Sequence, residues 1–201
     1  MRRKNDLKKF LTLIIIFSAI TLCSCSGRKN DTFFVHAAGF ENDNNGIKLT
    51  AILEKLSDDK ENFFTAERSS SSINKAADKL SKEYSDCYFA TSDLYFIPSS
   101  ISNDTLTKIA ENICDSNIFP TTSSIFCIKD SDFTGFLNQV KNNNYLRQLK
   151  KKKRENTVSF FASFYSGNDV SLDTYSLKNG SLTKTGTTTF NKSKKAVFNE
   201  D

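Results

Sequence analysis

The sequence has 201 residues, a length that suits one domain of moderate size with enough chain to bury a core. Hydrophobic residues make up 38% and aromatic residues 12%, which indicates a folded protein and excludes an intrinsically disordered one. Two prolines and seven glycines exclude a collagenous or proline-rich protein, and a single histidine excludes a histidine-rich metal site.

The N-terminus has the pattern of a bacterial lipoprotein signal peptide. Five basic residues and one acidic residue precede an apolar run over 10–22, which is shorter than the roughly 20 apolar residues of a transmembrane span. The run ends in Leu22-Cys23-Ser24-Cys25, an aliphatic and then a small residue before a cysteine. We therefore expect a signal peptide over 1–24, cleavage after Ser24 and a diacylglycerol thioether on Cys25. The alternatives are an uncleaved signal anchor, or ordinary cleavage that leaves Cys25 as a free thiol.

Removal of residues 1–24 changes the charge of the mature chain. It leaves 23 basic against 22 acidic residues, 23 − 22 = +1, because most of the basic excess belongs to the signal peptide. The diffuse positive charge of a nucleic-acid-binding protein is therefore absent, and we expect no nucleic-acid partner.

Three cysteines remain beyond the lipid site: Cys87, Cys114 and Cys127. Cys127 lies in the apolar run 124–128 and Cys114 falls on the apolar face of a helix pattern, so we expect both to be small buried hydrophobic residues. A bridge between these two is possible but is not predicted. No CxxC spacing occurs, so neither a zinc site nor thioredoxin-like chemistry is expected. We also expect no cofactor.

Residues 25–30 are expected to form a lipidated tether, and residues 31–201 one domain. Residues 31–40 and 46–53 predict two strands joined by an Asn- and Gly-rich turn, hence an antiparallel hairpin. A third strand is expected around 62–67. Serines at 69–72 then offer N-cap oxygens to an amphipathic helix, whose apolar positions are Ile73, Ala76, Ala77, Leu80 and Tyr84.

Two further helices are predicted, each with an acidic or amide cap. Asn103 or Asp104 is expected to cap the first, whose apolar face is Leu106, Ile109, Ala110 and Ile113. Asp130 or Asp132 is expected to cap the second, which runs through Phe133, Phe136, Leu137 and Val140 and is interrupted at 142–144.

Strands are expected at 93–98, at 121–128 and, as two or three segments, within 170–198, whereas 157–164 fits either a helix or a strand. The fold class is therefore α+β, with a mixed, largely antiparallel sheet packed against several amphipathic helices.

No group of residues predicts catalysis. His36 lies in the middle of a predicted strand, away from any activated serine or cysteine, so we interpret it as a packed or half-exposed structural residue. Asp130 and Asp132 fall short of a calcium loop, and no phosphate-binding loop occurs. The basic run Lys150–Arg154 could meet anionic headgroups, but a solvated helix face or loop is the simpler interpretation. We expect a protein that is not an enzyme.

The order of these segments resembles the N-terminal domain of the Ger(x)C family, the lipoprotein subunit of spore-germination nutrient receptors. Residues 25–31 (CSGRKND) are similar to the family's lipid cysteine, Arg-containing stretch and Asp. Residues 38–41 (AGFE), the Ser-rich helix entry at 69–72 and the Gly-x-x-x-Phe segment at 186–190 also match in order. Ser26 replaces the family's common Trp, and family members carry a large C-terminal portion beyond the segment that ends here at Asp201.

The resemblance implies a non-catalytic lipoprotein that is anchored on the outer face of the cell membrane, or of the spore inner membrane if the host sporulates. It implies integral-membrane receptor subunits as partners. Only one site residue of the family is carried over to this sequence: Cys25, as the lipid site. The alternative is a surface lipoprotein that binds a small solute or a peptide and has no part in germination.

Overall fold

The computed structural model describes residues 32–44, 46–55, 62–84, 87–140, 143–152, 155–178 and 181–200. Residues 31–201 form one compact unit. Its centre is a 10-stranded mixed sheet in the order β10-β9-β8-β6-β5-β1-β2-β3, with the short strands β4 and β7 attached to β1 and β6. The predicted α+β class is confirmed.

Four strands form the parallel centre of the sheet: β1 (Phe33–Asp43), β5 (Leu94–Pro98), β6 (Ser124–Ile128) and β8 (Val170–Lys178). Antiparallel strands extend both edges: β2 (Gly46–Lys55) and β3 (Asn62–Ser70) beyond β1, and β9 (Ser181–Asn191) and β10 (Lys194–Glu200) beyond β8. The predicted hairpin over residues 31–53 is the β1–β2 pair and is confirmed. Its turn is tighter than expected, because β1 continues to Asp43.

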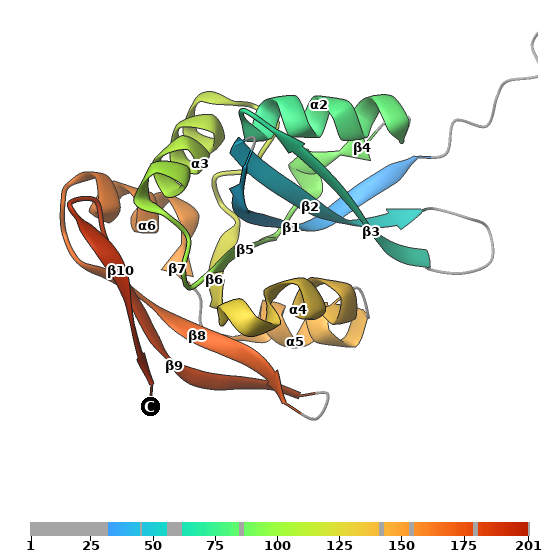
Figure 1. Cartoon of the computed structure of the whole chain (residues 1–201). Coiled ribbons are helices and arrows are strands. Elements are labelled where there is room, and N and C mark those ends of the chain that lie inside the picture. The colour runs from blue at the N-terminus through green and yellow to red at the C-terminus, as the bar shows by residue number, and fades with distance from the viewer. Residues whose placement is uncertain are drawn as a thin grey trace, which may run out of the picture. The chain divides into compact units, whose positions relative to one another are not determined.

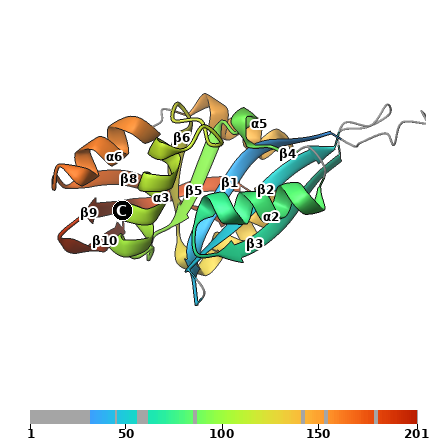
Figure 2. The same ribbon diagram turned by 90° about the horizontal axis from the view of Figure 1, so that it is seen from above.

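Helices cover both faces of this sheet (Figures 1 and 2). On one face lie α2 (Ile73–Glu83), α3 (Asn103–Asp115) and α6 (Thr157–Tyr165), whose apolar side chains join one core cluster with β1 and β5. On the other face lie α4 (Phe133–Val140) and α5 (Asn143–Lys151), which form a second cluster around Phe96 and Phe126. Figure 1 shows α2 above β1–β3 and α4 below them. Residues 157–164, which fit either state in the sequence, are helical.

The helices form where apolar residues recur at helical spacing, and a serine hydroxyl caps the N-terminus of two of them, α2 and α3. The Ser72 side chain accepts a hydrogen bond from the Lys75 backbone N–H, so the predicted serine cap of α2 is confirmed. The predicted cap of α3 was wrong: Ser102, not Asn103 or Asp104, accepts from the Thr105 N–H at 3.2 Å. Asn103 and Asp104 therefore occupy the first turn.

Of the two predicted caps of α4, Asp132 directly precedes the helix. A 3₁₀ turn, Asp130–Asp132, leads into α4, and Lys129, the N-cap of that turn, makes no side-chain capping bond. The Asp130 carboxylate instead accepts a hydrogen bond from the Ser100 backbone N–H at 2.8 Å. Asp130 thereby joins the loop after β6 to the loop after β5.

Burial was predicted for Cys127 and Cys114, and it is confirmed for Cys127 only. Cys127 on β6 is fully buried, as predicted. Cys114 on α3 is exposed, because the buried arc of that helix ends at Ile113 and the next residue is turned by about 100° from it. Cys87, Cys114 and Cys127 are all free thiols.

Candidate functional site

The predicted lipid site, Cys25, lies outside the described residues, as do residues 1–24 and the rest of the tether over 26–30. The described chain begins at Thr32 and enters β1 one residue later. Phe34 on β1 stacks on Tyr88 of β4 (Cys87–Tyr88), with ring centroids 5.9 Å apart. Tyr88 is 50% exposed. The chain therefore enters the folded unit beside an exposed aromatic side chain.

His36 is the half-exposed structural residue that the sequence predicts. Its Nε2 lies 2.5 Å from Glu54 Oε2 on the neighbouring strand, and its ring meets Phe63 edge-on at 5.2 Å between centroids. Among the described residues, no serine hydroxyl and no cysteine thiol bonds to its ring. The arrangement is that of a cross-strand pair and contains no nucleophile–base pair.

The basic run Lys150–Arg154 is partly helical. Lys150 and Lys151 form the last turn of α5, and the Lys150 ammonium pairs with the Asp93 carboxylate at the start of β5. The ammonium of Lys152 lies 5.3 Å from the centroid of the Tyr175 ring. Lys153 and Arg154 lie outside the described residues. At least the first and third lysines of the run therefore make contacts within the domain.

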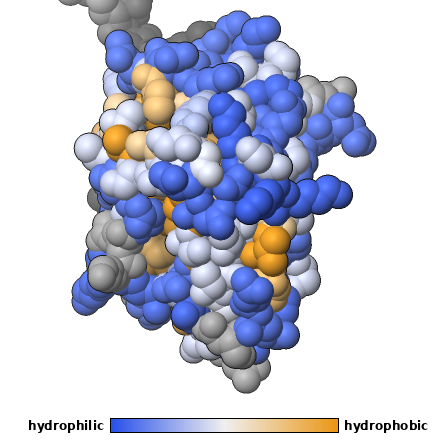
Figure 3. Space-filling model, turned by 90° about the vertical axis from the view of Figure 1, so that its left-hand side faces the viewer, coloured by the Kyte–Doolittle hydropathy of each residue, from blue (hydrophilic) through white to orange (hydrophobic). Residues whose placement is uncertain are grey.

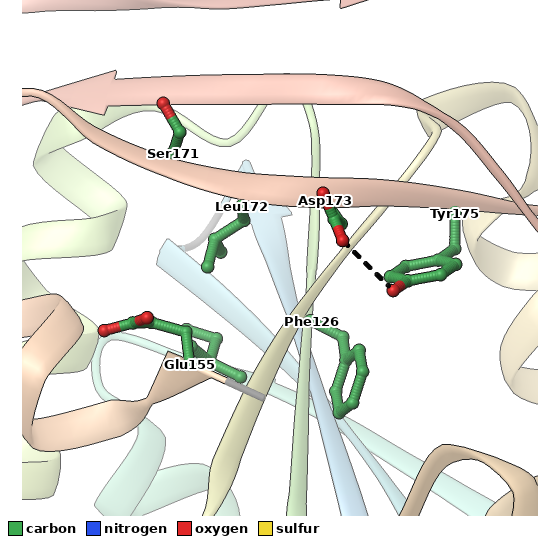
Figure 4. Close-up of a pocket in the computed structure, with 7 residues that line it drawn as sticks. Phe126, Glu155, Ser171, Leu172, Asp173 and Tyr175 are labelled. Atoms are coloured by element: carbon green, nitrogen blue, oxygen red, sulfur yellow. Dashed lines mark hydrogen bonds between the residues drawn. The ribbon is translucent and has the colours of Figure 1, made fainter. Parts of the chain in front are cut away.

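A polar cavity of about 210 Å³ lies where β6 divides its pairing between two strands (Figure 4). Ser124 and Ile125 pair with β7 (Glu155–Asn156), whereas Cys127 and Ile128 pair with β8. The strands β7 and β8 thus diverge on either side of Phe126. The cavity is the gap between them.

The side chains around this cavity already pair with one another. The Tyr175 hydroxyl lies 3.5 Å from Asp173 Oδ2, and Lys184 Nζ lies 3.3 Å from Asp173 Oδ1. Burial, together with the negative charge of Asp173, raises the pKa of the Tyr175 hydroxyl. The only histidine of the sequence does not line this cavity. These residues can bind a small polar group but do not form a constellation for acyl transfer.

Another concave region, of about 480 Å³, follows the carboxyl end of β5. It lies between the loop that leads into α3 and the start of β10, and Asn103 and Lys195 line it. The Asn103 Nδ2 donates to the carbonyls of Asn191 and Lys194, at 2.8 and 2.5 Å. Asn103 therefore fastens the β9–β10 turn to the N-terminus of α3.

Sequence reasoning missed both of these concave regions, since each combines segments far apart in the chain. On the side of the molecule that carries α6 and β10, hydrophilic side chains dominate and hydrophobic ones gather in small, separate patches (Figure 3). Within the described ranges, no three His, Cys, Asp or Glu side chains lie together so that they could hold a metal ion. None of the described helices has the length and apolar character needed to cross a membrane.

Comparison with known proteins found no matching family model, no matching curated protein and no matching solved structure.

Proposed function

We propose that this protein is a membrane-anchored, non-catalytic lipoprotein that resembles the C-type subunit of a spore-germination nutrient receptor. It acts through contacts with integral-membrane partner subunits. The observation that carries the proposal is the run from the apolar segment through Leu22-Cys23-Ser24-Cys25, followed within a few residues by the folded domain.

The short tether sets the geometry of this function. Six residues separate Cys25 from Thr32, and the seven steps from one to the other span about 25 Å when the chain is fully extended. Acyl chains on Cys25 therefore keep the domain next to the bilayer. Such confinement raises the effective concentration of the domain at a membrane partner, so that modest contacts suffice for assembly.

The exposed aromatic at the chain entry supports this orientation. Tyr88 presents an apolar ring with a polar hydroxyl, the combination that suits a membrane–water boundary. In this proposal the end of the domain that carries Phe34 and Tyr88 lies toward the membrane.

A crosslinked pull-down from detergent-solubilised membranes tests the proposal. The tagged wild type is compared with Cys25→Ala, and Cys114→Ser serves as the matched control because it removes an exposed thiol elsewhere in the domain. We expect wild type and Cys114→Ser to recover a polytopic partner, and Cys25→Ala to leave the membrane fraction and lose that partner. Recovery of the partner by Cys25→Ala would contradict the tethering mechanism. Recovery of the lipoprotein alone in every case would contradict the receptor function.

A further inference from the structure

A second polar cavity, of about 350 Å³, lies between α4 and the face of β1–β3 that α4 covers. Its volume is at the lower end of the range for small-molecule sites. The lining side chains come from four elements: Glu41 from β1, Thr50 from β2, Thr65 and Glu67 from β3, and Thr134, Leu137 and Asn138 from α4.

Strand register explains why this face is hollow. Gly39, Thr50 and Glu67 are direct neighbours across the three strands. Gly39 has no side chain, and Leu137 of α4 occupies the space beside it, so that an added Cβ would lie 2.7 Å from Leu137 Cδ1. Leu137 is the one apolar residue that lines the cavity, and its other lining positions on the sheet and on α4 are polar.

Thr50 forms the buried part of this cavity. Its side chain is on the lining although the residue is only 6% exposed. Within the described part of the chain its hydroxyl has no hydrogen-bond partner, whereas the neighbouring Thr65 hydroxyl donates to Asn138 Oδ1 at 3.3 Å. A hydroxyl that lines a cavity and makes no bond within the described protein is available to donate to or accept from a ligand.

The charges around Thr50 are mainly negative. Lys48 Nζ lies 2.5 Å from Glu41 Oε1 and 3.7 Å from Glu67 Oε2. Glu41 and Glu67 carry two negative charges and Lys48 one positive charge, so these three side chains have a net charge of −1. Glu67 is 61% exposed and more than a hydrogen-bond distance from Lys48, which leaves its oxygens able to accept further bonds.

We propose that this cavity binds a guanidinium group. Its polar lining is carboxylate, hydroxyl and amide oxygen, so it is rich in acceptors, and its net negative charge favours a cation. A guanidinium presents five N–H donors in one plane and is less strongly hydrated than an ammonium, which suits acceptors placed on separate strands and on a helix. The group can belong to a free small cation or to an arginine side chain of a partner protein. The inference does not depend on lipidation of Cys25.

The test uses the full mature chain in detergent and arginine amide as the probe, with citrulline amide as the control because its urea side chain is the uncharged isostere of the guanidinium. Binding is followed by saturation-transfer NMR and by the shift in melting temperature. Thr50→Val removes the unpartnered hydroxyl while keeping the side-chain shape, and we expect it to weaken arginine amide roughly tenfold. Glu67→Gln is expected to have a similar effect, and citrulline amide to bind at least tenfold more weakly than arginine amide.

Two variants outside the cavity serve as controls. Thr183→Val on β9 and Glu111→Gln on α3 repeat the same chemical changes at exposed positions and should leave binding unchanged. Absence of arginine amide binding, equal binding of citrulline amide, or unchanged affinity in a folded Thr50→Val protein would each overturn the proposal.

Repeating the crosslinked pull-down with Thr50→Val separates the two sources of the cation. Loss of the partner, with membrane attachment intact, identifies an arginine of that partner as the ligand. Retention of the partner together with weakened arginine amide binding identifies a free cation. Because membrane attachment is read from the fractionation itself, failure of the lipoprotein proposal is distinguishable from failure of this one.

Discussion

Leu137 of α4 fills the space that a side chain at Gly39 would need. An ideal Cβ on Gly39 would lie 2.7 Å from Leu137 Cδ1 and 3.0 Å from Cδ2. Gly39 thus allows α4 to approach β1 closely, and Leu137 forms part of the wall of the cavity between α4 and β1–β3 that Thr50 also lines.

Gly39→Ala is expected to destabilise the domain by about 1–3 kcal/mol, because the new methyl group displaces a packed leucine. Urea unfolding measures the effect. Gly135→Ala is the matched control: Gly135 lies within the same helix α4 and nothing approaches its Cβ position within 4 Å, so this change should stabilise by up to about 1 kcal/mol. In the double variant Gly39→Ala/Leu137→Ala the two losses should not add, and strict additivity would contradict the contact.

Asn103→Ala is expected to cost about 1–3 kcal/mol, because three backbone carbonyls in the β9–β10 turn lose the donor that they share. Hydrogen exchange should accelerate at residues 192–196 while the centre of the sheet stays protected. Asn112→Ala on the same helix removes only a local bond to the Lys108 carbonyl and should have a smaller effect. Equal losses in the two variants would show that Asn103 does not fasten the turn.

The three cysteines of the domain should differ in reactivity. Burial raises the pKa of the Cys127 thiol to about 11 and that of Cys87 to about 12, so at pH 7.5 almost none of either is thiolate. Cys114 is exposed. We expect iodoacetamide to modify Cys114 in the folded protein, and Cys87 and Cys127 only after unfolding, as mapped by mass spectrometry. Rapid native labelling of Cys127 would be inconsistent with its position in β6.

His36→Ala is expected to lower the free energy of unfolding by about 1 kcal/mol, since it removes the bond to Glu54 and the contact with the Phe63 ring. Membrane attachment and partner recovery in the pull-down should not change, because the proposed attachment is at Cys25 and the His36 side chain contacts Glu54 and Phe63 within the domain. A folded His36→Ala protein that lost partner recovery would assign this residue a direct role in assembly.

Local patterns predicted much of the secondary structure. The apolar spacing in α2, α3 and α4, the turn between β1 and β2 and the serine before α2 all act within a few residues, so the sequence alone carries them. The errors were also local. Several oxygen-bearing side chains stood near each helix start, and a shift of one residue separated the expected cap of α3 from Ser102. Cys114 stood one residue beyond the buried arc of its helix.

The sequence by itself determined the α+β class, the likeness to a lipoprotein signal and the absence of a catalytic motif. Only the tertiary structure decided the parallel order β8-β6-β5-β1, the division of the helices between two faces, and the position of Thr50 beside Gly39 and Glu67. Periodicity states which side of a strand is apolar but not which distant strand lies beside it. Cavities formed by residues as far apart as Glu41 and Asn138 depend on that pairing.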